Sequence, residues 1–398
     1  MAAAAENHLF NIFGHPEQVF VRGEGLWLID DKGDRYLDFI AGIAVNALGH
    51  AHPKLVEALH AQAQKLWHIS NMYKIEGQEK LAAKYCEKSF ADVVFFTNSG
   101  TEAIEASLKL VRKYHSANGH PEKVDIIGFS GSFHGRSYAA MNAAGNPGYL
   151  DGFGPALPGY KHCEFGDWER LKTLVDDKTA AIIIEPVQGE GGCQVVPDEA
   201  LKLMRRLCDE HGALLLYDEV QCGAGRTGKL WAYEWSGVAP DVLAVAKGVG
   251  GGFPLGACLA TREAAKGMVK GTHGTTYGGN PLAMAVGVAV WDILSQDEFM
   301  QRARDMANHL GQAIEGLKDR YPDLIEETRG RGLLRGLKLK IDPKIVQGAA
   351  RDRKLLVGVA GGNVLRLAPP LILEPEHISK MTDILDAAFA SARAEAAA

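Results

Sequence analysis

The sequence predicts an α/β fold, with a mostly parallel central sheet flanked by helices and a second, smaller domain of α+β type. Three observations support this. The chain has 398 residues, more than the roughly 250–300 at which a single core stops growing. From about residue 50, short apolar runs alternate with helical stretches, which is typical of a parallel sheet covered by helices. After about residue 285, a helix-rich pattern with a few short strands replaces that alternation.

The N-terminal segment predicts a small antiparallel meander, because residues 17–40 alternate between apolar and polar positions as strands do. Two apolar runs come first, at 19–21 and 26–29, and a turn at 31–34 separates them from a third run at 35–37.

Five continuous apolar runs predict strands that are buried on both faces. These runs are residues 93–96, 124–127, 181–184, 214–217 and 242–245. Residues 101–114 predict an amphipathic helix, since Ile104, Leu108 and Val111 recur on one face. Ligands of open parallel sheets bind outside the carboxyl ends of the strands. The residues that follow each run are therefore the candidates for function.

The C-terminal part predicts a long helix over 291–317, strands near 332–334 and 364–367, and a final helix over 377–394. The expected organisation is an N-terminal segment of the small domain (1–48), a large α/β domain (49–285) and the C-terminal part of the small domain (286–398).

Composition excludes several classes of protein. The net charge of −6 without a long run of one sign argues against a nucleic-acid binder. No apolar run approaches the ~20 residues of a membrane span, and the start has no targeting signal, so we expect a cytoplasmic protein without membrane contact. The six cysteines are scattered, which favours reduced thiols over disulfides or a metal site.

The first strand leads into Ser99, Gly100 and Thr101 at the start of the predicted helix. Free N–H groups at a helix start form an anion site, and the hydroxyl groups add donors. The alternative is a plain capping box between Ser99 and Glu102.

The second and third strands lead into an aromatic, an arginine and two glutamates. Phe133 can stack on a flat heterocycle and Arg136 can grip a carboxylate, although a core phenylalanine and a surface arginine fit the pattern equally well. Glu185 and Glu190 follow the third strand, where a solvated loop is the alternative.

The fourth strand ends at Asp218, followed by Glu219, Val220 and Gln221. A carboxylate at the end of an apolar strand needs a partner to offset its desolvation. A protonated ring nitrogen would serve as that partner, and a structural salt bridge is the alternative.

The fifth strand leads into Lys247, followed by glycines. Lysines rarely lie at such buried positions without cause, and a buried amine is activated as a nucleophile or for a Schiff base. A P-loop is excluded by order, because the lysine precedes the glycines. Thr275 and Thr276 lie in a later glycine turn before a helix and provide another possible phosphate contact.

These features together fit one cofactor, pyridoxal phosphate. Lys247 would bind its aldehyde, Asp218 its pyridinium nitrogen, and Phe133 would stack on its ring. The turn 99–101 would hold the phosphate, and Gln221 would bond the ring oxygen.

The sequence also resembles the class-III, or ω-amino, aminotransferases from Gly23 to Pro370. The segments that carry the resemblance are NSGTEAIEASLKLVRKY, SFHGRS, EPVQGEGG, YDEVQCGAGRTG, AKGVGGGFPLGA, TTYGGNP and NVLRLAPPL. The resemblance implies fold type I of pyridoxal-phosphate enzymes, with a small domain from both chain ends. It also implies a homodimer whose active site lies at the subunit interface, with Gly100 and Thr101 helped by Thr276 of the partner subunit in binding the phosphate.

For substrates, the resemblance implies that Arg136 takes the carboxylate remote from the reacting amine and that Arg366 takes the α-carboxylate of glutamate. Thr275 would lie near an acyl-amino group. An unpaired Arg366 would be costly when the amine substrate has no carboxylate beside its reacting carbon. We therefore expect Glu190 to pair with Arg366 in that half-reaction and to swing away for glutamate.

The segment 41–50 resembles that of family members that act on N-acetylornithine. The implied reaction is a ping-pong transfer from N-acetylornithine to 2-oxoglutarate. The alternatives are other ω-amino donors, namely succinylornithine, succinyl-diaminopimelate, ornithine or 4-aminobutyrate. Lys247 with Asp218 argues against a non-catalytic relative of the family. The two arginines, Arg136 and Arg366, argue against a racemase or decarboxylase on the same fold.

Overall fold

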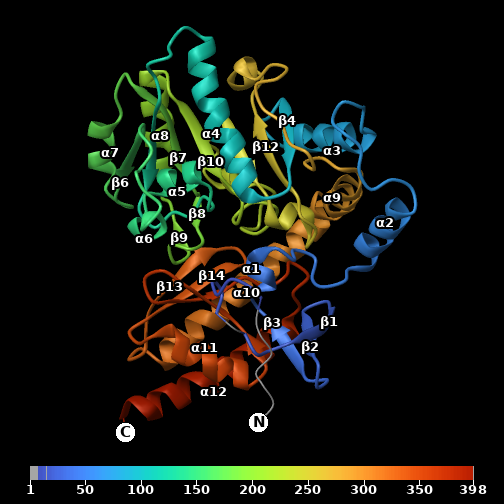
Figure 1. Ribbon diagram of the computed structural model, residues 1–398. Coiled ribbons are helices and arrows are strands. Elements are labelled where there is room, and N and C mark those ends of the chain that lie inside the picture. The colour runs from blue at the N-terminus through green and yellow to red at the C-terminus, as the bar shows by residue number, and fades with distance from the viewer. Residues whose placement is uncertain (1–7, 15, 398) are drawn as a thin grey trace.

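The computed structural model describes residues 8–14 and 16–397. Figure 1 shows two bodies, one above the other. The upper body contains the largest sheet, and the lower body contains the segments near both chain ends.

The largest sheet of the described chain has seven strands in the order β4-β12-β11-β10-β7-β5-β6. Strand β12 runs antiparallel to β11 and β4, whereas β10 with β11, β10 with β7, β7 with β5 and β5 with β6 are parallel pairs. The predicted mostly parallel sheet is confirmed. The bounds are β4 Val93–Thr97, β5 Asp125–Phe129, β6 Tyr160–Cys163, β7 Thr179–Ile184, β10 Leu214–Asp218, β11 Val242–Val245 and β12 Gly256–Ala260.

Helices cover both faces of this sheet, as the continuous apolar runs predict. Successive strand residues point to opposite faces. In β10, Leu214 and Leu216 belong to the core beneath α4, whereas Leu215 and Tyr217 belong to the core beneath α8. The helices of this body are α2 Pro53–Ala63, α3 Glu76–Glu87, α4 Gly100–Ala117, α5 Tyr138–Ala144, α6 Pro147–Leu150, α7 Trp168–Leu174, α8 Asp198–His211 and α9 Pro281–Leu294.

The lower body contains two smaller sheets and the remaining long helices (Figure 1). The predicted meander is confirmed as β1-β2-β3. Strand β15 pairs with β3 in parallel, so this sheet combines an N-terminal and a C-terminal part of the chain. The second sheet has the order β13-β14-β17-β16. The bounds are β1 Phe20–Glu24, β2 Trp27–Asp30, β3 Arg35–Asp38, β13 Ile325–Arg331, β14 Leu334–Leu339, β15 Leu355–Leu356, β16 Gly358–Ala360, β17 Val364–Leu367, α10 Asp297–Arg320, α11 Pro343–Asp352 and α12 Pro375–Ala397.

Short elements complete the described chain. They are α1 Ala41–Ala44, strands β8 Val187–Gln188 and β9 Gln194–Val195, and three 3-10 turns, η1 Ala232–Trp235, η2 Lys247–Gly250 and η3 Ala264–Gly267. No helix in residues 8–14 and 16–397 has both the length and the apolar character needed to cross a bilayer.

Two sequence predictions in the C-terminal part were wrong in detail. The single helix expected over 291–317 is two helices, α9 and α10, because Gln296 is extended (φ −78°, ψ 126°). The strand expected near 332–334 begins only at Leu334, since Gly332 has a φ of +64° and turns the chain between β13 and β14. The predicted domain boundaries stay a prediction, and α9 crosses the one at 285 while packing on α2 and α3.

Candidate functional site

A cavity of about 320 Å³ opens at the carboxyl ends of the parallel strands, within the size range of ligand sites. The segment that follows each of the five predicted strands contributes to its wall. The lining residues include Ser99, Gly100, Thr101, Phe133, His134, Glu185, Glu190, Asp218, Val220, Gln221 and Lys247. The fold thus brings most of the predicted site residues together, although up to 148 positions separate them in sequence (247 minus 99).

Lys247 directly follows β11 and Ala246, and begins the turn η2. Its φ of +48° is in the left-handed region, which is a strained conformation for a residue with a Cβ. Burial, together with nearby Arg366, lowers the pKa of its amine to about 8. Among the described residues its Nζ has no hydrogen-bond or ion-pair partner and it lines the cavity, so the amine is available to a ligand.

Asp218 ends β10, is 2% exposed and is held on two sides. Its Oδ2 lies 2.7 Å from His134 Nδ1, and its Oδ1 accepts the N–H of Val220 at 2.9 Å. The His134 side chain is fully buried and its Nε2 has no partner among the described atoms. A carboxylate fixed in this way can hold a positive charge, such as a protonated ring nitrogen, at a set place in the cavity.

The start of α4 forms one end of the cavity. Ser99 caps the helix by accepting the N–H of Glu102 at 3.3 Å, as the capping alternative predicts. The Glu102 carboxylate, however, turns back to Asn98 rather than to Ser99. The N–H groups of Gly100 and Thr101 lie in the first turn, where no intrahelical partner exists. This end of the cavity can therefore hold an anion while Ser99 also caps.

Gly100 has a packing reason to be glycine. A Cβ at this position would lie 2.6 Å from Cγ1 of Val220. Without that Cβ, the start of α4 packs closely on the Val220 side chain, and both residues line the cavity.

Phe133 lines the cavity and packs edge-on against Tyr149 of α6, with ring centroids 5.8 Å apart. The Arg136 guanidinium lies 4.0 Å from the Tyr149 ring centroid and is exposed. Arg136 does not line the cavity itself. Its guanidinium stacks on the Phe133 and Tyr149 rings beside the cavity and has no ion-pair partner among the described residues. Arg136 can therefore receive a carboxylate at the mouth of the cavity.

Glu185 follows β7 and is 4% exposed. It accepts the N–H of Phe133 at 3.1 Å and that of Gly189 at 3.5 Å. Burial and the neighbouring Asp218 raise the pKa of Glu185 well above its usual range. This carboxyl ties the loop with Phe133 to the loop that carries Glu190.

Arg366 and Glu190 form a pair in this structure, with 2.5 Å between Nη1 and Oε1. The same Nη1 donates to Gln221 Oε1 at 3.2 Å. Arg366 lies in β17 with its side chain 4% exposed, whereas that of Glu190 is 31% exposed. Arg366 is therefore the buried partner of the pair and Glu190 the more exposed one.

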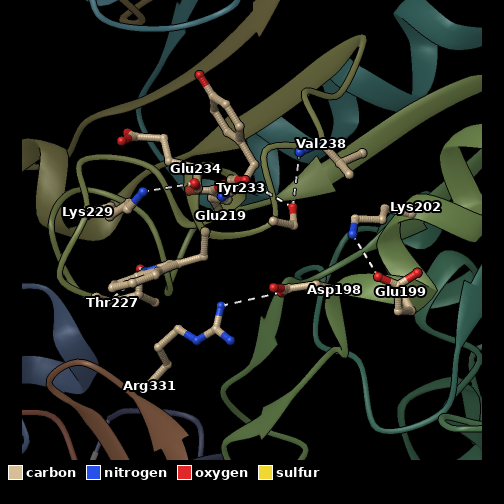
Figure 2. Close-up of polar contacts among 12 residues, drawn as sticks. Asp198, Glu199, Lys202, Glu219, Thr227, Lys229, Tyr233, Glu234, Val238 and Arg331 are labelled. Carbon is tan, nitrogen blue, oxygen red and sulfur yellow. Dashed lines mark hydrogen bonds and ion pairs between the residues drawn. The ribbon is translucent and has the colours of Figure 1, made fainter.

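Three predicted residues lie elsewhere in this chain. Glu219 turns away from the cavity, and its carboxylate accepts the N–H groups of Ala232 and Tyr233. Figure 2 shows Glu219 beside Tyr233. Burial raises the pKa of Glu219 to about 8. Thr275 and Thr276 line a separate surface hollow with Asn98 and Glu102. They do not line the cavity that contains Lys247 in the same chain.

Sequence reasoning missed two residues that the structure places at the site. His134 adjoins Phe133 in sequence, but nothing in the pattern shows that it faces Asp218, 84 positions away. Tyr149 lies in a short helix without a strand before it, so the rule of searching strand ends does not reach it.

The residues of the cavity fit pyridoxal phosphate. An amine without a protein partner among the described residues, a buried carboxylate, an aromatic ring and the open first turn of α4 surround one space. These are the groups that an aldehyde, a pyridinium nitrogen, a flat ring and a phosphate require. No set of three or more His, Cys, Asp or Glu side chains in the described chain is arranged to hold a metal ion.

Comparisons with known proteins agree with this geometry. A sequence model of the family described as Aminotransferase class-III matches residues 13–389. A protein of Caulobacter vibrioides named Acetylornithine aminotransferase 2 is 56% identical over 399 residues, which covers 100% of this chain and 98% of the relative.

Two solved structures have the same fold. N-acetylornithine aminotransferase from Stenotrophomonas maltophilia is 36% identical with a TM-score of 0.85, over 97% of this chain and 99% of that one. Ornithine aminotransferase from Toxoplasma gondii, solved with partial occupancy of the cofactor PLP at its active site, is 30% identical with a TM-score of 0.91. The alignment with it covers 96% of this chain and 92% of the other.

Proposed function

This chain belongs to the class-III aminotransferases, and on that premise we propose that it transfers the terminal amino group of N-acetylornithine to 2-oxoglutarate. The products are N-acetylglutamate 5-semialdehyde and glutamate, and the reaction is a step of arginine biosynthesis. The relatives named acetylornithine aminotransferase support this substrate. The fold is type I of pyridoxal-phosphate enzymes, and the enzyme uses that cofactor.

The observation that carries the proposal is the placement of Lys247 and Asp218 in one cavity. When bound, the cofactor supplies an aldehyde for amines and a ring that accepts the electrons of a broken C–H bond. Asp218, oriented by His134, holds the charge on the ring nitrogen. Lys247 is the group that binds the aldehyde at rest and moves a proton at the reacting carbon. A pKa near 8 suits this role, because the amine both accepts and donates protons near neutral pH.

The two substrates present their carboxylates at different places. N-acetylornithine reacts at its terminal amine, so its carboxylate lies far from the reacting carbon, where Arg136 is exposed at the mouth. Glutamate carries a carboxylate beside the reacting carbon, where we assign Arg366. The observed Glu190–Arg366 pair supports the first state, because it neutralises Arg366 while no such carboxylate is present.

We also propose a homodimer. Segments 66–73 and 275–278 lie side by side, since Asn71 donates to the carbonyls of Thr275 and Gly278. They expose Trp67, Met72, Tyr73 and Tyr277, an apolar surface of the kind that partners cover. Thr276 of the partner subunit would then complete the phosphate site. The cysteines of the described chain are all unpaired, which supports a reducing compartment such as the cytoplasm.

An amine-donor panel tests the substrate. The purified holoenzyme is supplied with 2-oxoglutarate and, in turn, N-acetylornithine, succinylornithine, succinyl-diaminopimelate, ornithine and 4-aminobutyrate, and glutamate formation is measured. We expect N-acetylornithine to give the highest kcat/KM, by roughly tenfold or more over ornithine. A higher kcat/KM for ornithine or 4-aminobutyrate would reject this substrate while leaving the aminotransferase assignment intact. A Lys247→Ala variant gives the background rate.

A further inference from the structure

Arg226 is a buried cation that has no anionic partner in the described part of the chain. It lies in the segment 223–228 that follows Gln221, and it is 2% exposed. Its Nη1 donates to two backbone carbonyls, those of Leu333 (3.3 Å) and Pro369, whereas its Nη2 has no partner among the described atoms. Two hydrogen bonds to neutral carbonyls do not offset the desolvation cost of a buried guanidinium. A residue kept there at such a cost calls for a function.

The two carbonyls belong to the strands that hold Arg366. Leu333 directly precedes β14, and Pro369 comes two residues after the end of β17. These strands pair antiparallel, with Gly336 of β14 opposite Arg366 of β17. Arg226 therefore binds both strands beyond the same end of their ladder. A shift of either carbonyl would move the position from which the Arg366 guanidinium extends.

The backbone of the same segment locks the contact. The carbonyl of Arg226 accepts the N–H of Leu333 at 2.9 Å, so Leu333 is held through both of its peptide groups. A Cβ at Gly332 would lie 2.3 Å from the Thr227 carbonyl carbon. The turn between β13 and β14 thus lies directly on the segment with Arg226, with no space for sliding.

The residues just before this segment reach the cavity. They follow Asp218, and Gln221 among them accepts a hydrogen bond from the Arg366 guanidinium at 3.2 Å. The N–H of Gly223 donates to Glu219, and the N–H of Arg226 donates to Gly223. The short, hydrogen-bonded stretch 219–228 therefore contacts the Arg366 guanidinium through Gln221 and holds the Arg366 strand through Arg226.

We propose that Arg226 is a positioning residue of the carboxylate site, which fixes β17 so that the Arg366 guanidinium meets a carboxylate beside the reacting carbon. The inference rests on the proposed function, because it takes Arg366 as the group that binds glutamate and 2-oxoglutarate there. Substrates without such a carboxylate do not depend on Arg226 in this way.

A second contact between the same parts offers a matched control. At the outer side of the turn, Arg331 lies over the Trp235 ring at 5.3 Å, and its Nη1 is 3.8 Å from Asp198 Oδ1 (Figure 2). This contact joins Arg331, the last residue of β13, to the upper body without touching β17 or Pro369. If Arg226 only fastened the two parts together, loss of Arg331 and loss of Arg226 would have the same kind of effect.

The test compares Arg226→Met, Arg226→Lys, Arg331→Gln and Arg366→Lys as holoenzymes, with KM and kcat measured for N-acetylornithine and for 2-oxoglutarate. We expect Arg226→Met to raise KM for 2-oxoglutarate about tenfold or more, since misplacement of a positioned group by about 1 Å can cost up to about 100-fold. KM for N-acetylornithine should change less than about threefold. Arg226→Lys, which keeps one donor to a carbonyl, should fall between Met and wild type, and it carries the test if the Met variant does not fold.

The remaining variants separate the outcomes. Arg331→Gln should lower Tm without changing the ratio of the two KM values. Equal changes in both KM values for the Arg226 variants, or no change in either, would overturn the positioning role, provided that Arg366→Lys selectively weakens 2-oxoglutarate. If Arg366→Lys shows no such selectivity, the assignment of Arg366 in the proposed function fails instead.

Discussion

At the scale of single residues, the site depends on groups whose surroundings change their chemistry. Lys247 has an ordinary side chain, but burial lowers the pKa of its amine to about 8. Its left-handed backbone, with a φ of +48°, directs it from the end of β11 into the cavity. Glu185 shows the opposite effect, since burial beside Asp218 raises its pKa. Both shifts come from one low-dielectric space, which penalises charge of either sign.

The pKa of Lys247 predicts a pH profile. The neutral amine attacks the aldehyde, and it forms as the pH rises through the pKa. The rate of covalent pyridoxal phosphate binding to the cofactor-free protein should therefore rise with pH and level off above a midpoint near 8. Stopped-flow absorbance measures this rate. A midpoint at the ordinary lysine value of 10.5 would show that the amine is solvated, and Lys247→Ala should show no covalent phase.

Residues beside Arg366 also show how closely the site is built. Its cross-strand neighbours are both glycines, Gly336 in β14 and Gly358 in β16. A Cβ at Gly358 would lie 2.5 Å from Ile40 Cδ1 and 3.5 Å from Arg366 Nε. The Arg366 side chain thus lies close to Gly358, where β16 has no side chain.

At the scale of elements, the unit β4–α4 combines stability with binding. Strand β4 ends at Thr97, and Ser99 two residues later caps α4. The first turn of that helix borders the cavity. The cap satisfies one N–H group and leaves those of Gly100 and Thr101 for an anion. One short segment therefore serves both the helix and the cofactor.

A comparison of two helix caps tests this double role. Ser99→Ala removes the cap of α4, and Asp342→Ala removes that of α11, where Asp342 accepts the N–H of Lys344 at 2.9 Å. Each should lower the free energy of unfolding by roughly 0.5–2 kcal/mol, measured by urea titration. Only Ser99→Ala should also weaken cofactor binding, measured by equilibrium dialysis. Equal cofactor affinity in both variants would mean that Ser99 acts as a cap alone.

At the scale of the whole molecule, the site draws side chains from both bodies. The large sheet supplies Lys247 and Asp218 to the cavity. Arg366 comes from β17 of the lower body and does not line the cavity itself, but it bonds Glu190 and Gln221, which do. Thr275 and Thr276 lie outside the cavity of their own chain. A second chain that covers the apolar surface around them would bring them to a neighbouring site, as the proposed homodimer requires.

Hybrid dimers test whether Thr276 acts across the interface. Lys247→Ala and Thr276→Glu chains carry different tags and are co-expressed, and the hybrid is isolated by two successive affinity steps. Each parent should be nearly inactive. In the hybrid, one site has an intact lysine and an intact partner threonine, so we expect about half of the wild-type activity. No recovery in an isolated hybrid of two inactive parents would show that Thr276 acts within its own chain. An active Thr276→Glu parent would show that Thr276 has no role at the site.

The sequence alone predicted the elements that local patterns define. Apolar runs identified five strands of the large sheet, because strands buried on both faces need apolar residues at successive positions. It missed β6 and β12, with the sequences Tyr-Lys-His-Cys and Gly-Ala-Cys-Leu-Ala, since neither forms a run of large apolar residues. The site followed from the strands, because the carboxyl ends of parallel strands meet at one edge.

The direction of side chains and the contacts between distant segments were decided by the tertiary structure alone. Asp218 and Glu219 are adjacent in sequence, yet one faces the cavity and the other binds the turn η1. In the sequence, Arg226 is part of a glycine-rich stretch with no sign of a special role. In the fold, its guanidinium binds the carbonyls of Leu333 and Pro369, which are 107 and 143 positions away. The physical reason is that local propensity fixes an element and its ends. The partner of a buried polar group, by contrast, depends on which strands the whole chain brings beside it.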